Sequence, residues 1–242
     1  MSFERTRTGI DSLDALIEGG IPRGRIILIA GGCGTGKSIL STQFIYEGAK
    51  HFNEPGIMIT TEERPKSIRQ NMLRFGWNLK ELEDGKKLAI IDAASPKARI
   101  PSSEMYKISY YDTNSLLLKI YEAVNEIGAK RAVIDSIPGL ALRLESDSEI
   151  RRAISQLGSL LSELECTSLV VSEVNIPGRL GRFGIEEFIA DGVFLLENSQ
   201  VDGRYQRTFS IVKMRGTDNS ADVHELKITD KGIEVISKGR KK

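Results

Sequence analysis

Residues 31 to 38 carry the side chains and the spacing of a phosphate-binding loop. They read Gly-Gly-Cys-Gly-Thr-Gly-Lys-Ser, and they follow a short apolar run, Ile26 to Ala30, that indicates a buried strand. The glycines permit the left-handed backbone conformations that turn successive N–H groups toward an anion. A helix that begins near Lys37 adds unpaired N–H groups and the positive end of its dipole. The expected chemistry is therefore the binding of a nucleoside phosphate.

Two side chains extend this chemistry beyond the backbone. Lys37 is expected to reach the outer phosphates, and the Ser38 hydroxyl is expected to ligate Mg²⁺. The alternative is a glycine-rich turn that binds nothing, which the strand before the loop and the helix after it disfavour. The residues predicted to bind the nucleotide are Gly32, Cys33, Gly34, Thr35, Gly36, Lys37, Ser38 and Ile39.

Asp135 is the second predicted metal ligand. It follows the apolar run 132–134, which indicates another buried strand. A carboxylate at such a strand end can hold Mg²⁺, directly or through water, beside the β- and γ-phosphates. Strands also end in an aspartate that only caps the next turn, so the order of the strands relative to the phosphate loop is what favours the metal role.

Glu62 and Glu63 close the strand predicted at 56–61. Strand ends next to a phosphate loop face the nucleotide, so one of these carboxylates could orient and deprotonate an attacking water. Their mutual repulsion would raise the pKa of one of them. The alternative is that Glu63 only favours the start of a helix at Pro65.

Lys213 and Arg215 lie two residues apart on a predicted strand, so both cations should project from one face. They could be the charged residues that protect an edge strand from aggregation. They could instead neutralise the γ-phosphate held by a neighbouring subunit, and such cationic fingers accelerate phosphoryl transfer by about 10³ to 10⁵.

Alternating strands and helices must position these residues. After the first strand we expect a helix over 37–50, strands at 56–61, 88–91, 132–134 and 168–172, and helices at 65–75, about 116–127 and 150–164. The segment 93–112 has no clean period and is interpreted as a loop. The last third is strand-like at 193–196, 208–214, 223–228 and 233–236. The predicted fold is an α/β protein with a mostly parallel central sheet, extended at one edge by antiparallel C-terminal strands.

Composition narrows the class of protein without naming a function. The chain has 242 residues, 40% hydrophobic and 28% charged, and no linker-like stretch divides it, so we expect a single domain over 1–242 with short tails. No apolar run approaches about 18 residues and no signal peptide is evident, so a cytoplasmic protein without membrane contact is expected. Two cysteines fit a reducing compartment. The net charge of +1 gives no global attraction to nucleic acid.

The chain resembles the KaiC-type ATPases of the RecA superfamily, and in particular the N-terminal ATPase domain of KaiC. The matching segments run almost end to end: Thr8 to Asp14, Gly19 to Gly24, Gly34 to Ser38, Glu62-Glu63, Phe75-Gly76-Trp77, Ile134-Asp135-Ser136, Glu186-Glu187-Phe188, Asp191, Lys213 to Gly216 and Ile228 to Gly232. The resemblance implies a RecA-like P-loop NTPase fold, hydrolysis of ATP with Mg²⁺, and a homohexameric ring with a nucleotide at each interface. It also implies the catalytic role of Glu62 and Glu63 with Lys37, and the trans role of Lys213 and Arg215.

Departures from the family limit the expected function. KaiC joins two such domains and this chain holds one, and residues 179 to 190 contain no Ser, Thr or Tyr that could accept a phosphate, so autokinase activity is not expected. One class of function is a nucleotide-dependent switch that acts on a protein partner. The other is a DNA-handling ATPase related to the archaeal recombinases, in which the loop 175–184 binds single strands. Single-strand binding combines a basic groove with stacking aromatics, and this loop offers only Arg179, Arg182 and Phe183. The switch is therefore favoured.

Overall fold

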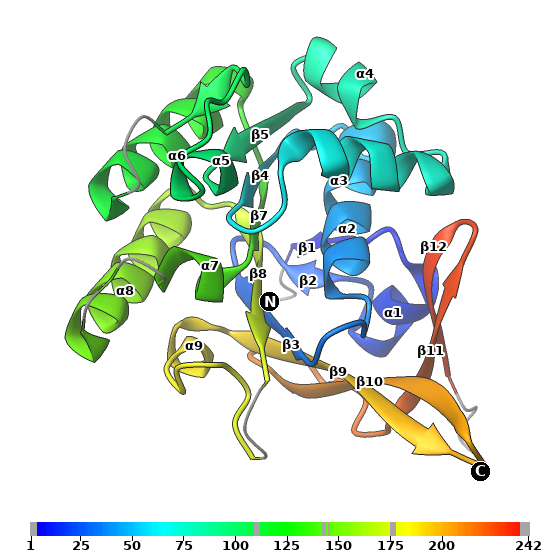
Figure 1. Cartoon of the computed structure of the whole chain (residues 1–242). Coiled ribbons are helices and arrows are strands. Elements are labelled where there is room, and N and C mark those ends of the chain that lie inside the picture. The colour runs from blue at the N-terminus through cyan, green and yellow to red at the C-terminus, as the bar shows by residue number, and fades with distance from the viewer. Residues whose placement is uncertain (1–3, 109–111, 142–143, 145, 175–177, 238–242) are drawn as a thin grey trace.

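The computed structural model describes residues 4–108, 112–141, 144, 146–174 and 178–237. Figure 1 shows helices on both sides of a central twisted sheet. The helices are α1 (Asp11–Leu16), α2 (Lys37–His51), α3 (Pro65–Met72), α4 (Leu79–Asp84), α5 (Ala94–Lys97), α6 (Thr113–Ile127), α7 (Ile137–Ala141), α8 (Asp147–Glu163) and α9 (Glu186–Ile189), with a 3-10 turn (Leu73–Phe75) after α3. The strands are β1 (Arg5–Thr6), β2 (Ile21–Pro22), β3 (Ile26–Gly31), β4 (Gly56–Thr60), β5 (Leu88–Asp92), β6 (Tyr106–Lys107), β7 (Arg131–Asp135), β8 (Thr167–Glu173), β9 (Gly192–Val201), β10 (Arg204–Met214), β11 (His224–Thr229) and β12 (Gly232–Ile236).

The order of the strands confirms the predicted fold class. In the described part of the chain, the large sheet runs β12-β11-β10-β9-β3-β8-β7-β4-β5-β6, and β1 and β2 form a separate antiparallel pair. The pairs from β9 through β3 to β6 are parallel, and the pairs from β9 outward through β10, β11 and β12 are antiparallel. The apolar run 193–196 therefore differs from expectation in one respect. Its strand, β9, lies parallel to β3, and the antiparallel extension begins only at β10.

Successive residues of the parallel strands point to opposite faces of the sheet, and helices cover both faces. Both faces are therefore buried. Ile27 and Ile29 of β3 belong to the core beneath α1 to α4, whereas Ile57 and Ile59 of β4 belong to the core beneath α6 and α8. Strands buried on two faces are mostly apolar, and β3, β4 and β5 are buried along their entire length, including Thr60 and Asp92 at the ends of β4 and β5. Helices thus cover the two faces of the sheet (Figure 1).

Arg131 is a charged residue inside this core. Its side chain is fully buried, yet its guanidinium donates to Glu54 Oε2 from Nε at 2.8 Å and from Nη2 at 2.6 Å, and to the Phe44 carbonyl at 2.7 Å. The guanidinium carbon also lies 4.5 Å from the centre of the Phe44 ring. A Cβ at Gly48 would stand 2.3 Å from Arg131 Nε. The guanidinium carbon lies 5.3 Å from the centre of the Phe52 ring as well, so the arginine is accommodated by one carboxylate, one carbonyl, two rings and one missing side chain.

The segment predicted as a loop at 93–112 contains two short elements, α5 and β6. Helix α4 is a further element without a long periodic pattern, since it has six residues and begins where the Asn78 side chain accepts a hydrogen bond from the Glu81 N–H. Elements this short show less than two turns of any hydrophobic period. None of the helices in the described ranges is long and apolar enough to cross a membrane.

Candidate functional site

The phosphate loop links the carboxyl end of β3 to the amino end of α2. Gly34 and Gly36 have positive φ angles of 73° and 104°, which other residues adopt only with strain, and Gly36 is the N-cap of α2. The Thr35 hydroxyl donates to the Gly32 carbonyl at 3.0 Å and closes the turn. No atom lies within 4 Å of where a Cβ of Gly32 would stand. The loop therefore takes the shape that the glycine spacing predicts, with free space beside its backbone.

Lys37 is the first residue of α2, and its side chain turns back to the loop. Its ammonium donates to the carbonyls of Gly31 at 2.9 Å and Gly32 at 2.6 Å. Burial lowers the pKa of Lys37, and the carboxylates of Glu173 and Asp135 act in the opposite direction. Glu173 ends β8 directly opposite Gly31 in the register of the sheet. A cation surrounded by carbonyls and acids at a helix start is well placed to meet a polyphosphate.

Ser38 and Asp135 lie together, as a shared metal ligand role requires. The Ser38 hydroxyl is hydrogen-bonded to the Asp135 carboxylate, which lowers the pKa of Asp135, but burial of that carboxyl group is the larger effect and raises the pKa overall. Both residues line a cavity of about 110 Å³, together with Thr42, Met58, Thr60, Glu62, Glu63, Ile68 and Met72. A hydroxyl and a desolvated carboxylate are hard oxygen donors of the kind that Mg²⁺ takes. The donor set therefore fits the metal that the sequence predicts.

Glu62 and Glu63 also line this cavity, but their surroundings differ. Glu62 is exposed and accepts a hydrogen bond from the Ser136 hydroxyl. Glu63 is half-buried and accepts a hydrogen bond from the Asn71 amide of α3 at 2.7 Å. Burial raises the pKa of Glu63, and the charge of Asp135 raises it further. The expected pKa increase is present, but its causes are burial and Asp135, not the neighbouring Glu62.

The lateral pairing of β4 with β7 brings these acids together. Thr60 is opposite Asp135, and the Thr61 N–H donates to the Asp135 carbonyl at 2.9 Å. The Thr61 hydroxyl donates to the Ser136 carbonyl at 2.8 Å and accepts from the Ser136 N–H at 2.9 Å. The peptide bond between Asp135 and Ser136 is cis. Residues more than seventy positions apart in the chain thus meet at the carboxyl edge of the sheet.

Further contacts at the loop carry no signal in the sequence. Arg207 of β10 donates from Nε to the Gly34 carbonyl at 3.0 Å. The hairpin of β11 and β12 also packs on the loop, since Ile233 and Ile228 lie 3.2 Å and 3.4 Å from where a Cβ of Gly36 would stand. These C-terminal strands therefore support the phosphate loop of their own chain.

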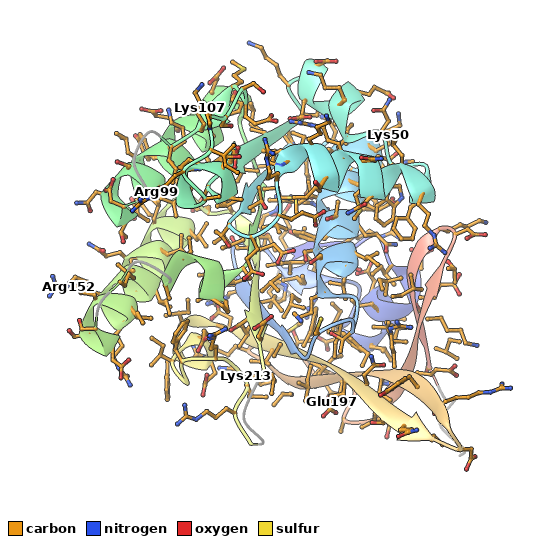
Figure 2. The ribbon with its side chains drawn as sticks, in the orientation of Figure 1. Lys50, Arg99, Lys107, Arg152, Glu197 and Lys213 are labelled. Carbon is orange, nitrogen blue, oxygen red and sulfur yellow. The ribbon has the colours of Figure 1, made fainter. Side chains whose placement is uncertain are left out.

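Lys213 and Arg215 lie elsewhere. Lys213 donates to the Glu187 carbonyl of α9 at 2.8 Å, and Figure 2 shows its side chain beside that helix. Arg215 directly follows β10, is 63% exposed, and pairs with the Asp191 carboxylate at 3.5 Å. Burial lowers the pKa of Lys213, Arg215 lowers it further, and Asp191 and Glu187 act against them. The structure brings the two cations together but not to the cavity that holds the acids.

The sheet register separates Arg215 from the phosphate loop of its own chain. The Arg215 N–H donates to the Asp191 carbonyl, and the Asp191 N–H donates to the Ile26 carbonyl at the amino end of β3. The loop begins at the carboxyl end of β3, after Gly31. Five residues of strand and two strand spacings put the Cα of Arg215 about 19 Å from the Cα of Gly31. That is well beyond the length of an arginine side chain.

The predicted DNA-contacting loop 175–184 is described from Gly178 onward, and residues 175–177 lie outside the described ranges. Arg179, Arg182 and Phe183 line a cavity of about 130 Å³ together with Asp147, Ile150, Arg151 and Ile185. Arg182 also pairs with Glu173 at 3.4 Å. The loop is fixed by the fully buried Glu186, whose carboxylate accepts from the Ser172 hydroxyl at 2.8 Å and from backbone N–H groups of the loop.

Known proteins are similar to this chain along almost its whole length. A family model described as the KaiC ATPase matches residues 6–240. The crystal structure of a KaiC-like protein from the hyperthermophilic archaeon Pyrococcus horikoshii superimposes with a TM-score of 0.86 at 39% sequence identity, covering 97% of this chain and 100% of the other. A UPF0273 protein of Thermotoga maritima is 40% identical over 96% of both chains.

A longer relative is the circadian clock oscillator protein KaiC 1 of Synechocystis sp. It is 37% identical over 98% of this chain, but the chain spans only 45% of that protein's length. The similarity therefore extends to one part of the clock protein and to the whole of the shorter relatives.

Proposed function

We propose, because this chain belongs to the KaiC family of RecA-like ATPases, that it binds ATP at residues 31–39 and hydrolyses its terminal anhydride bond at interfaces between copies of itself. The observation that carries the proposal is the gathering of Ser38, Asp135, Glu62 and Glu63 around one cavity beside Lys37. Phosphoryl transfer needs a cradle for the phosphates, a site for a cation and an acceptor for the proton of water. The residues that would supply all three lie at the same edge of the sheet.

The residues of the chain would have separate roles in the reaction. Backbone N–H groups of the loop and the Lys37 ammonium bind the β- and γ-phosphates. A carboxylate of the Glu62 and Glu63 pair accepts the proton of a water whose oxygen attacks the γ-phosphorus, while the bond to the bridging oxygen breaks and leaves ADP and phosphate. Glu63 suits the role of proton acceptor, since burial and the charge of Asp135 raise its pKa. The Ser136 hydroxyl bonded to Glu62 would hold that carboxylate in place.

Ser38 and Asp135 would hold Mg²⁺. The cation supplies positive charge that stabilises the developing negative charge on the phosphate oxygens. In the described part of the chain no three His, Cys, Asp or Glu side chains gather into a protein-only metal site. A site of one hydroxyl and one carboxylate fits a metal that completes its coordination with water and substrate.

Lys213 and Arg215 would complete the site of a neighbouring copy. They lie at the amino edge of the sheet and the loop lies at the carboxyl edge, so each chain would carry one half of each of two different sites. A head-to-tail interface joins unlike surfaces and closes into a ring when the rotation permits. We infer a homohexameric ring, as the family resemblance implies.

The ring would act as a nucleotide-dependent switch on a protein partner. The alternative, an ATPase that handles DNA, draws on the cavity lined by Arg151, Arg179 and Arg182. Asp147 lines that same cavity, and Glu173 pairs with Arg182, which reduces its positive charge. Binding of labelled single-stranded DNA at several salt concentrations separates the two functions. A steep salt dependence would favour DNA handling, and an absence of binding would favour the switch.

Two variants test the hydrolytic function. Lys37→Ala should abolish ATP binding, measured by titration calorimetry, and an unchanged affinity would contradict the proposed phosphate cradle. Replacing Glu62 and Glu63 together by Gln should keep binding and stop release of phosphate. Continued hydrolysis in that double variant would return the pair to a role in capping α3. Native mass spectrometry with and without ATP and Mg²⁺ measures the proposed ring directly.

A further inference from the structure

We propose that Asp191 is a positioning residue that holds Arg215, and with it Lys213, in the orientation needed to reach the phosphate of a neighbouring copy. The inference rests on the proposed function, because it assigns a support to cations that act in trans. Asp191 immediately precedes β9, and its side chain is only 13% exposed. No chemistry at the phosphate loop requires a carboxylate at this opposite edge of the sheet.

The contacts of Asp191 are well suited to fix Arg215. Its backbone carbonyl accepts the Arg215 N–H at 2.9 Å, and its Oδ1 pairs with Arg215 Nη1 at 3.5 Å. The same Oδ1 accepts from Arg25 Nη1 at 3.1 Å, and Oδ2 accepts from the Ile26 N–H at 3.2 Å. Oδ2 is thus anchored to the backbone at the start of β3, a buried strand of the central sheet, whereas Oδ1 is shared by two partly exposed arginines. The carboxylate is a fixed point from which an exposed arginine can be held.

Without the ion pair to Asp191, the Arg215 side chain would have no preferred orientation. It follows the last residue of β10 and precedes Gly216, whose φ is 73°. A long side chain at a turn loses much conformational entropy when it must adopt one geometry. The ion pair with Asp191 restricts the Arg215 side chain before the neighbouring copy binds, so less entropy is lost at the interface. Among the described residues only one guanidinium nitrogen of Arg215 has a carboxylate partner, so the others are available to a phosphate.

Asp191 also acts on Lys213. The charged groups of the described residues that face Lys213 are Arg215, Asp191 and Glu187, and Arg25 shares Asp191 with Arg215. Burial and Arg215 lower the pKa of Lys213, whereas Asp191 and Glu187 raise it. The carboxylate therefore offsets the repulsion between two cations that must stand side by side.

A simpler alternative is that Asp191 only joins β9 to β3. The variant Asp191→Asn separates the two roles, because its amide oxygen can still accept from the Ile26 N–H while the negative charge that attracts Arg215 is gone. Arg25→Gln is the matched variant, since it removes the other arginine from the same carboxylate and leaves Arg215 paired. Asp84→Asn is the control for loss of a surface charge, since Asp84 pairs with Lys80 in an exposed contact on α4.

The first measurement separates kcat from ATP affinity. Arg215→Ala should lower kcat by about 10³ or more. Asp191→Asn should lower kcat by about 10- to 100-fold, as expected for a misplaced catalytic group, and leave the Kd for ATP within about twofold. Arg25→Gln and Asp84→Asn should keep kcat within about twofold of the unmodified protein. In the double variant of Asp191→Asn with Arg215→Ala, the loss should fall short of the product of the two single losses, because both changes affect one interaction.

The second measurement is the pH dependence of kcat. Lys213 must be protonated to meet a phosphate, so activity is lost as the pH rises through its pKa. Removal of the Asp191 charge lowers that pKa, and the alkaline limb should move to lower pH in Asp191→Asn but not in Asp84→Asn. An unmoved limb in Asp191→Asn would show that the Asp191 charge does not act on a catalytic Lys213.

The outcomes distinguish the inference from its premise. An unchanged kcat in Arg215→Ala would remove the trans cation itself and with it the proposed interface. A large loss in Arg215→Ala with unchanged kcat in Asp191→Asn would overturn only the positioning role. Equal losses of kcat and ATP affinity in Asp191→Asn, or single losses that multiply in the double variant, would assign Asp191 to the fold.

Discussion

Mixed assemblies of two inactive variants should regain ATPase activity. Lys37→Ala destroys the phosphate cradle and keeps the cations, whereas Arg215→Ala keeps the cradle and removes one cation. Because Arg215 lies about 19 Å from the loop of its own chain, each variant supplies what the other lacks only across an interface. Each variant alone should therefore be nearly inactive.

The size of the recovery follows from the separation of the two half-sites. In an equal mixture assembled at random, half of the loops and, independently, half of the neighbouring cations are intact, so about a quarter of the interfaces are complete. At one part to three, in either direction, about a fifth are complete. Phosphate release per chain should follow this symmetric curve, with its maximum at equal proportions.

A second mixture supplies the control. Unmodified protein mixed equally with the double variant of Lys37→Ala and Arg215→Ala should retain about a quarter of full activity if the cations act across interfaces, and about half if they act within one chain. Native mass spectrometry must show that the chains have exchanged. Mixed rings without recovery, or retention of half the activity in the control mixture, would refute the trans arrangement.

Three further changes test the site itself. Asn71→Ala removes a hydrogen bond that lowers the pKa of Glu63, so the pKa should rise and the acid limb of the kcat profile should move to higher pH, because the base must be ionised; an unmoved limb would exclude Glu63 as that base. Asp135→Asn should abolish the dependence of ATP binding on Mg²⁺, yet raise the melting temperature in chelator. Burial raises the pKa of Asp135 in the folded state, so ionisation of this carboxyl group opposes folding. The increase in melting temperature should therefore be present at neutral pH and vanish as the pH falls toward the ordinary pKa of 3.8. A lower melting temperature of the variant at neutral pH would contradict this sign. Gly139→Ala would place a Cβ 2.0 Å from the Thr61 hydroxyl, so chemical denaturation should show a loss of about 1–3 kcal/mol, and an unchanged midpoint would mean that this contact relaxes freely.

The parts of the fold that depend on local pattern could be predicted from the sequence. The apolar run at 26–30, the glycines that follow it and the helix from Lys37 form one contiguous unit, and β3, the loop and α2 agree with it. Helix α8 likewise follows from a stripe of apolar residues at spacings of three and four. In both cases the relevant information lies within about twenty residues.

The parts that depend on lateral pairing could not be predicted. Glu62 is the sequence neighbour of Glu63, yet Asp135 is the acid that raises the pKa of Glu63, because β4 pairs with β7. The separation of Arg215 from the phosphate loop depends on β9 running parallel to β3 while β10 runs antiparallel to β9. Strand neighbours and directions are properties of the whole sheet, and nothing in a single segment encodes them.

The buried Arg131 makes the residues at positions 48, 54 and 131 depend on one another. Its guanidinium needs the Glu54 carboxylate for charge balance and the bare backbone of Gly48 for room. A methyl group at position 48 would push the guanidinium away, and loss of the carboxylate would leave an unpaired charge in the core at a cost of about 3–5 kcal/mol. Related chains that place an apolar side chain at position 131 should therefore be free to vary at positions 48 and 54, and those that keep the arginine should vary at neither. Covariation among these three positions in related chains would show that they evolved together to accommodate the buried arginine.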